Sequence, residues 1–183
     1  MGMSAPVYYS ADMVRALPED GNRYETVHGE LLVTPAPTVW HQEIVTRLLF
    51  LLRDYLSRHP IGYQVLASPA DISWTDDTLV QPDLFVADLE ELRSLEWQNV
   101  KTLSLVIEVL SPSTVRYDCF TKRRLYQEVR VPAYWIVDPR QHVVEVWTPG
   151  DALPAVQREV VVWSPPGARA PLRVSLVDLF RAM

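Results

Sequence analysis

The sequence predicts a mixed α/β fold of the α+β type, in which helices flank a mixed central sheet. Three observations support this prediction. Apolar residues recur at helical spacing from Ile44 to Leu56, and two apolar runs, Leu79–Val86 and Leu103–Leu110, are typical of buried strands. A second helical segment then precedes another apolar strand, Ala133–Val137. The order of helix, several strands, helix and strand is the order expected for one sheet flanked by helices.

The N-terminal region predicts a short helix followed by an extra hairpin. Ser10 is placed to cap a helix over Ala11–Leu17, which ends at a proline. Two short runs of strand-forming residues, Tyr24–Val27 and Glu30–Thr34, then flank His28-Gly29, a turn signal between the two strands of a hairpin.

The middle of the chain contains the clearest helix and the strands of the sheet. The helix begins at Thr38 and ends at His59-Pro60. Further strands are expected at Tyr63–Ala67 and Ala70–Trp74, before the two apolar runs. Leu103–Leu110 is apolar on both faces, which predicts a central position in the sheet.

The C-terminal third predicts a second long helix and several extra strands. The helix starts at Thr114 or Asp118 and runs to Val129. Val143–Trp147 and Val160–Trp163 are expected to be strands that pair with each other, and Ser175 is placed to cap a short terminal helix.

Length and composition limit the classes of protein to consider. The 183 residues fit one domain spanning residues 1–183, and 48% of them are hydrophobic. The single cysteine, Cys119, excludes an internal disulfide and a zinc cluster built on thiolates. No apolar run is long enough to span a membrane, and Met1–Pro6 lacks a signal-peptide pattern, so we expect a cytoplasmic protein.

Two acidic residues lie inside apolar runs and are the strongest functional signal. Asp83 follows Pro82 in one run, and Glu108 lies within the other. A carboxylate in a buried strand is unfavourable unless it is paired, hydrogen-bonded or bound to metal. Two such acids on nearby strands predict a shared divalent cation. The alternative for Asp83 is an acid that bonds the backbone at the end of a strand; Glu108 has no turn beside it.

A lysine on the second long helix is predicted to face the same place. Lys122 is spaced i, i+3, i+4 and i+7 with Leu125, Tyr126 and Val129, so it shares their inward face. An inward lysine needs an anionic partner, and both Asp118 and Glu108 are candidates. The alternative is a local pair with Asp118 in which the lysine extends outward to solvent.

Other polar residues carry weaker signals. Glu30 begins a hairpin strand, where solvated acids are as common as functional ones. The four histidines lack the spacing of a helical zinc motif, although His41 lies in the first turn of the long helix and is a candidate to face a cleft. Ser111 and Ser113 flank a proline beside Glu108, without a histidine base placed by the sequence. There is no glycine-rich phosphate loop and no nucleophile elbow.

Taken together, these motifs resemble one known family. The segments Gln81–Val86, Leu105–Thr114, Asp118–Tyr126 and Val131–Pro139 are similar to those of the Uma-two family, with further similarity from Tyr24–Glu30 and His41-Gln42 to Asp178–Phe180. This bacterial family is restriction-endonuclease-like and belongs to the PD-(D/E)XK nuclease superfamily. The resemblance implies a core of one helix, three strands, a helix and a further strand.

The resemblance also implies roles for individual residues. Asp83 and Glu108 would be the two magnesium ligands, and Glu30 an accessory acid. The superfamily lysine is expected two residues after the second acid, where this chain has Leu110. The family is expected to supply it from the next helix, which matches Lys122. His28 stands where the family usually has aspartate.

The resulting hypothesis is a nuclease that hydrolyses phosphodiester bonds, with DNA as the expected substrate, Mg²⁺ or Mn²⁺ as cofactor, and a homodimer as the expected assembly. Asp83, Glu108 and Lys122 would be catalytic, with Glu30, Asp118 and Tyr126 as accessory residues. The candidates for nucleic-acid contacts are Arg116, Arg123 and Arg124. The net charge of −6 weighs against nonspecific nucleic-acid binding, although bound cations reverse the local field. The alternatives are a non-catalytic DNA- or protein-binding accessory module and a hydrolase of small phosphoesters.

Overall fold

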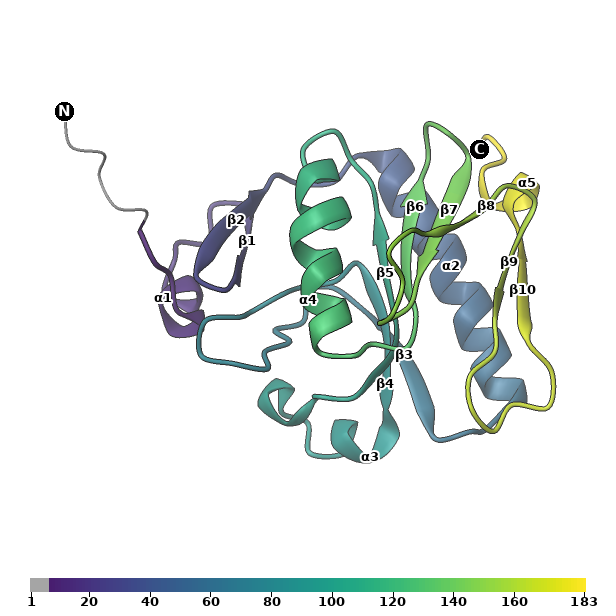
Figure 1. The fold of residues 1–183 in the computed structure, drawn as a ribbon, viewed down its shortest axis with the longest axis horizontal. Coiled ribbons are helices and arrows are strands. Elements are labelled where there is room, and N and C mark those ends of the chain that lie inside the picture. The colour runs from purple at the N-terminus through teal and green to yellow at the C-terminus, as the bar shows by residue number, and fades with distance from the viewer. Residues whose placement is uncertain (1–6) are drawn as a thin grey trace.

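A central mixed sheet organises the molecule, which a computed structural model describes over residues 7–183 (Figure 1). Met1–Pro6, the segment in which no signal-peptide pattern was found, falls outside the described residues. The sheet has six strands in the order β3-β4-β5-β6-β7-β8. Their bounds are β3 Tyr63–Ala67, β4 Leu84–Asp88, β5 Leu103–Val109, β6 Tyr134–Asp138, β7 Val143–Trp147 and β8 Ala155–Gln157.

Strand β5 occupies a central place, as its two-sided apolar pattern predicted. It pairs antiparallel with β4 on one side and parallel with β6 on the other. The parallel pair needs a crossover, which is supplied by η2 (Tyr117–Lys122), a π-helical turn, and α4 (Arg123–Glu128). All seven residues of β5 are buried, including Glu108.

Two helical layers cover opposite faces of the sheet (Figure 1). The predicted long helix is confirmed as α2 (Val39–Arg58), and its N-cap Thr38 accepts a hydrogen bond from the main chain of His41. Its apolar residues pack in one core cluster with Leu105, Ile107 and Val109 of β5. The opposite cluster joins Val106 to Leu125 and Tyr126 of α4. Side chains alternate along a strand, so Glu108 shares the α4 face with Val106.

Several smaller elements lie outside the six-stranded sheet. The predicted hairpin is confirmed as β1 (Arg23–Val27) and β2 (Glu30–Thr34), with positive φ angles at His28 and Gly29 in its turn. The remaining elements are α1 (Ala11–Arg15), α3 (Leu89–Leu92), η1 (Trp97–Asn99), β9 (Val160–Trp163), β10 (Leu172–Ser175) and α5 (Leu176–Leu179). Ser10 and Ser175 cap α1 and α5, as predicted.

Three secondary-structure predictions were wrong. The strand expected over Leu79–Val86 begins only at Leu84, because Pro82 has no N–H to donate to a ladder. The strand expected at Ala70–Trp74 is reduced to one bridge between Ile72 and Val80.

The third wrong prediction concerns the C-terminal strands. Val143–Trp147 and Val160–Trp163 do not pair with each other, because each finds its own antiparallel partner, β8 and β10 respectively. Neither partner strand was predicted.

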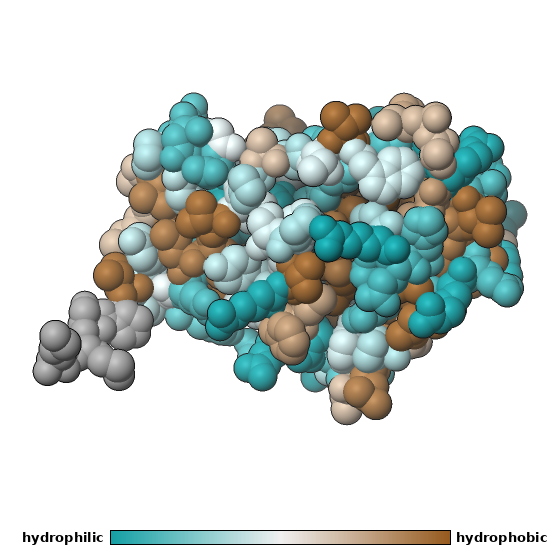
Figure 2. All heavy atoms as spheres, turned by 90° about the horizontal axis from the view of Figure 1, so that it is seen from above, coloured by the Kyte–Doolittle hydropathy of each residue, from teal (hydrophilic) through white to brown (hydrophobic). Residues whose placement is uncertain are grey.

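The surface of the molecule carries scattered apolar residues. Figure 2 shows hydrophobic residues on one face as separate groups between hydrophilic ones. Single exposed apolar side chains are normal for folded proteins. Among residues 7–183, none of the helices has the length and apolar character needed to cross a membrane.

Candidate functional site

Asp83 and Glu108 meet where β4 begins and β5 ends. The main-chain N–H of Val109 donates to Asp83 Oδ2 at 2.9 Å, and the N–H of Asp83 donates to Glu108 Oε2 at 3.3 Å. Both side chains are almost fully buried. Each carboxylate is thus held by the main chain at or next to the other acid, so the two acids lie side by side at this end of the sheet.

Two basic side chains complete the surroundings of Asp83. Arg23 Nη1 donates to Asp83 Oδ1 at 3.1 Å, and His41 Nε2 lies 3.0 Å from Asp83 Oδ2. Burial disfavours the charged form of Asp83, but the hydrogen bond from His41 and the charge of Arg23 outweigh it and hold the pKa of Asp83 well below its usual range. Asp83 is therefore ionised, and His41 Nε2 carries the shared proton.

Lys122 points inward and lies among three acids. Its Nζ is 2.9 Å from Glu25 Oε1, 3.0 Å from Glu108 Oε1 and 3.6 Å from Asp118 Oδ1. Only 2% of its side chain is exposed, which excludes the outward arrangement considered from the sequence. Burial works against its charge, but the three carboxylates, Glu108 first, outweigh burial and raise the pKa of Lys122. The lysine is therefore a permanent cation inside the site.

Glu108 also has a perturbed pKa. Burial raises its pKa well above the ordinary value; Lys122 opposes this shift, and Asp118 and Asp83 add to it. Tyr126, which is fully buried on α4, donates its hydroxyl to Glu108 Oε1 at 3.3 Å. Burial and the neighbouring carboxylates keep that hydroxyl protonated by raising the pKa of Tyr126. Glu108 thus receives donors from Asp83, Lys122 and Tyr126.

The π-helical turn η2 brings Asp118 and Lys122 to the same side. Such turns are rare and often occur at functional sites. Burial is the main reason that the pKa of Asp118 is raised to about 6. Asp118 Oδ1 accepts no hydrogen bond among the described residues, and neither does Glu25 Oε2. All four acids that are buried in residues 7–183 lie in this cluster: Glu25, Asp83, Glu108 and Asp118.

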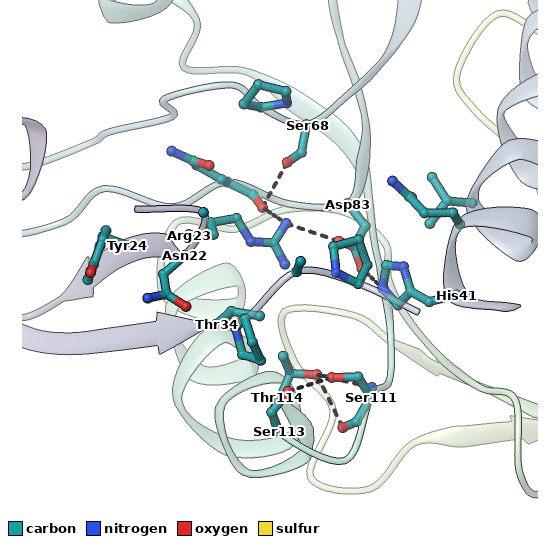
Figure 3. A pocket seen from close by; sticks show the side chains of 18 of the residues that line it. Asn22, Arg23, Tyr24, Thr34, His41, Ser68, Asp83, Ser111, Ser113 and Thr114 are labelled. Carbon is teal, nitrogen blue, oxygen red and sulfur yellow. Dashed lines mark hydrogen bonds and ion pairs between the residues drawn. The ribbon is translucent and has the colours of Figure 1, made fainter. Parts of the chain in front are cut away.

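A cleft of about 1240 Å³ opens beside Asp83. Figure 3 shows Arg23 and His41 reaching Asp83 from opposite sides, with the hydroxyls of Ser111, Ser113 and Thr114 below them. Most of the polar residues that line the cleft are uncharged. Asp83 is thus the point at which the buried acid cluster reaches the cleft.

Comparison with protein families assigns the chain to one of them. The model of the Uma2 family, described as "Putative restriction endonuclease", matches residues 11–178. This chain belongs to the Uma2 family.

A solved structure gives the Uma2 chain a structural counterpart. A crystal structure described as a putative nuclease belonging to DUF820, from Anabaena variabilis ATCC 29413, superposes with a TM-score of 0.75. The sequences are 21% identical, and the match covers 94% of this chain and 97% of the other. The two proteins therefore share the nuclease-like fold, which confirms the fold class predicted from the sequence. No curated protein matches the chain.

Some residues predicted for the site of this Uma2 protein lie elsewhere. Glu30, expected as an accessory acid, is exposed at the start of β2 and outside the cluster. Arg116, Arg123 and Arg124 do not line the cleft around Asp83. Arg116 and Arg124 are exposed, while Arg123 donates to the Cys119 carbonyl and stacks over Trp147.

Sequence reasoning did not select Glu25 or Arg23, and it placed His41 only as a candidate to face a cleft. Ile44, Val45 and Leu48 follow His41 at i+3, i+4 and i+7, the same spacing that placed Lys122 inward. Glu25, Thr26 and Val27 are all buried in β1, so alternation along this strand did not mark Glu25. Arg23 lay outside the predicted hairpin strand, so no signal singled it out.

Proposed function

We propose that this Uma2 protein is a divalent-metal-dependent nuclease that hydrolyses phosphodiester bonds, with DNA as the expected substrate. The observation that carries the proposal is the convergence of Asp83 and Glu108 around an inward Lys122 beside an open cleft. This is the donor set that a metal-assisted phosphoryl hydrolase needs. The family description supports the same reaction class.

The chemistry of the buried cluster fits a divalent cation. Four carboxylates face two permanent cations, Lys122 and Arg23, so two negative charges lack a balancing charge when all four acids are ionised. Among residues 7–183 no group of three or more His, Cys, Asp or Glu is arranged as a metal site. Two carboxylates are nevertheless sufficient for Mg²⁺, which keeps several waters and shares substrate phosphate oxygens. Asp83 and Glu108 would hold it.

The residues around the proposed metal site would have separate roles. When bound, a divalent ion would lower the pKa of a water that it holds, and its positive charge would polarise a phosphate oxygen. Lys122, fixed by Glu25 and Glu108, presents a permanent positive charge that would stabilise negative charge developing on the phosphate. Tyr126 holds Glu108 in place through its hydroxyl. His41 orients Asp83 at the edge of the cleft.

One observation favours a non-catalytic binding module instead. Every carboxylate oxygen of Asp83 and Glu108 already accepts a hydrogen bond from the protein. A closed network of this kind is also what a purely structural cluster would show. In that case the acids would stabilise the fold, and the cleft would bind a partner without chemistry.

Metal titration followed by thermal melting, together with a cleavage assay, separates the two functions. For the nuclease, Mg²⁺ or Mn²⁺ should raise the melting temperature of the wild type and not of Asp83→Ala, because a ligand that binds only the folded state stabilises it. The wild type should also cleave plasmid, single-stranded DNA or RNA, and Glu108→Gln should not. Nucleic-acid binding without metal stabilisation or cleavage would support the binding module. Equal cleavage by wild type and Glu108→Gln would identify a contaminant. The expected homodimer stays a prediction, which sedimentation tests.

A further inference from the structure

Arg23 lies at the boundary between the buried acids and the cleft. Its Nη1 makes two hydrogen bonds, one to Asp83 Oδ1 at 3.1 Å and one to the Gln81 carbonyl at 3.0 Å. Its side chain is 21% exposed and lines the cleft. Figure 3 shows the guanidinium directed at Asp83 from the β1 side. Arg23 is thus fixed at one nitrogen and open to the cleft.

The other edge of this guanidinium has no partner. Within residues 7–183, Arg23 Nε and Nη2 donate to nothing, and neither is among the buried polar atoms that lack a partner. These two nitrogens form the side-on fork of arginine, which matches two oxygens of a phosphate. The unused donors therefore face solvent next to the proposed site of hydrolysis.

The other arginine of the cleft is already engaged. Arg15 pairs with Asp12 at 2.8 Å and lies 3.6 Å from Asp71. No lysine lines the cleft among the described residues, and besides Asp83 and the two arginines its charged residues, Glu19 and Asp71, are acidic. A phosphate entering this cleft would therefore meet one cation with a free fork, and that cation is Arg23.

We propose that Arg23 is the phosphate-binding residue of the site, with Nη1 kept on Asp83 while Nε and Nη2 donate to the non-bridging oxygens of a nucleic-acid phosphate. This inference rests on the proposed nuclease function, because it names the residue that holds the substrate. It also explains how a chain of net charge −6 can accept a polyanion near four buried acids.

The competing role for Arg23 is simple neutralisation of Asp83. Lysine can neutralise a carboxylate, but it lacks the planar fork. Arg23→Lys should therefore keep the melting temperature near that of the wild type while weakening phosphate binding. Arg23→Met should lower the melting temperature and also weaken phosphate binding. Arg58→Met is the matched control, because Arg58 is exposed at the end of α2 and, among the residues that the structure describes, pairs with Asp54 alone.

Two measurements test the proposal. The first is the increase in melting temperature caused by inorganic phosphate, which does not depend on nuclease activity. We expect an increase for the wild type and Arg58→Met, and a much smaller one for both Arg23 variants. Equal increases in Arg23→Lys and wild type, or none in wild type, would overturn the proposal.

The second measurement is binding of a labelled oligonucleotide in Ca²⁺ at several salt concentrations. Arg23→Lys should raise Kd about tenfold or more, since a bidentate charge-assisted contact is lost. Arg23→Met should also reduce the magnitude of the slope of log affinity against log salt by roughly one, as expected for one lost phosphate contact. If the wild type binds the oligonucleotide and both Arg23 variants bind it with the same Kd, the proposed role of Arg23 is overturned, while the proposed nuclease function is not. A phosphate-dependent melting shift without any nucleic-acid cleavage would instead remove the nuclease function and leave Arg23 as an anion-binding residue.

Discussion

Lys122 contacts Glu25 as closely as it contacts Glu108: its Nζ is 2.9 Å from the first carboxylate and 3.0 Å from the second. Glu25 belongs to the β1–β2 hairpin, which is not part of the six-stranded sheet. The same strand carries Arg23, which bonds Asp83. Residues two apart on a strand share one face, so one hairpin contributes to both halves of the acid cluster.

Replacing Glu25 tests how much the hairpin supports Lys122. Glu25→Gln keeps an acceptor for the Gln81 N–H, which lies 2.7 Å from Glu25 Oε1, but removes one counter-charge of a buried lysine. We expect a loss of about 1–3 kcal/mol in the free energy of unfolding, measured by urea denaturation. Glu30→Gln on the same hairpin is the control: because Glu30 is exposed, its change should stay within about 0.5 kcal/mol. Equal losses in the two variants would show that Lys122 does not depend on Glu25.

His41 offers a test of how Asp83 is held. His41→Leu removes the donor to Asp83 Oδ2 and leaves Arg23 and Val109 as its partners. We expect the unfolding free energy to fall by about 1–3 kcal/mol, because a buried acceptor on an ionised group loses a partner. His41→Gln, which can place an amide N–H near the same oxygen, should recover part of this loss. If Leu and Gln destabilise equally, the hydrogen bond has no energetic role.

Asp118 should make the stability of the protein depend on pH. Burial is the main reason that its pKa is raised to about 6 from the ordinary aspartate value of 3.8. The folded state therefore binds more protons than the unfolded state between these values, and stability falls as pH rises through this window. Asp118→Asn removes this dependence. The unfolding free energy of the variant minus that of the wild type should therefore increase as the pH rises from 4 to 7, by an amount on the order of 3 kcal/mol.

A matched variant makes the pH experiment specific to burial. Asp12, with 92% of its side chain exposed, is the control position. Chemical denaturation across the pH range should give parallel curves for wild type and Asp12→Asn, and a diverging curve for Asp118→Asn. A parallel curve for Asp118→Asn would mean that this acid titrates as it does in the unfolded chain.

Cys119 should be a slow nucleophile. Burial, with smaller contributions from nearby acids, raises the pKa of its thiol to about 11. Because the thiolate is the reactive form, alkylation by iodoacetamide at pH 7.5 should be far slower than in urea-unfolded protein, where the thiol has an ordinary pKa of about 8.5. Mass spectrometry gives both rates. Similar rates in the folded and unfolded chain would contradict the raised pKa.

Much of the fold could be predicted because the spacing of apolar residues along the chain indicates individual helices and strands. The spacing of Ile44, Leu48 and Leu52 predicted α2, and the apolar run around Glu108 predicted a central strand. The pairing of the C-terminal strands could not be predicted in this way. Val143–Trp147 and Val160–Trp163 have similar patterns, and the choice of partners depends on contacts between distant segments.

The sequence by itself determined which residues carry the unusual chemistry: acids within apolar runs, and a lysine on the apolar face of a helix. Those positions follow from side-chain periodicity, which is a local property of the chain. Only the tertiary structure decided which of them meet. Glu25 joins the cluster and Glu30 does not, although both lie on one hairpin. Val27 pairs with Glu30 and Glu25 pairs with Leu32, so both acids lie on the same face of the hairpin. Glu30 lies beside the turn and is exposed, whereas Glu25 lies further along and is covered by segments distant in the sequence, which only the tertiary structure places there.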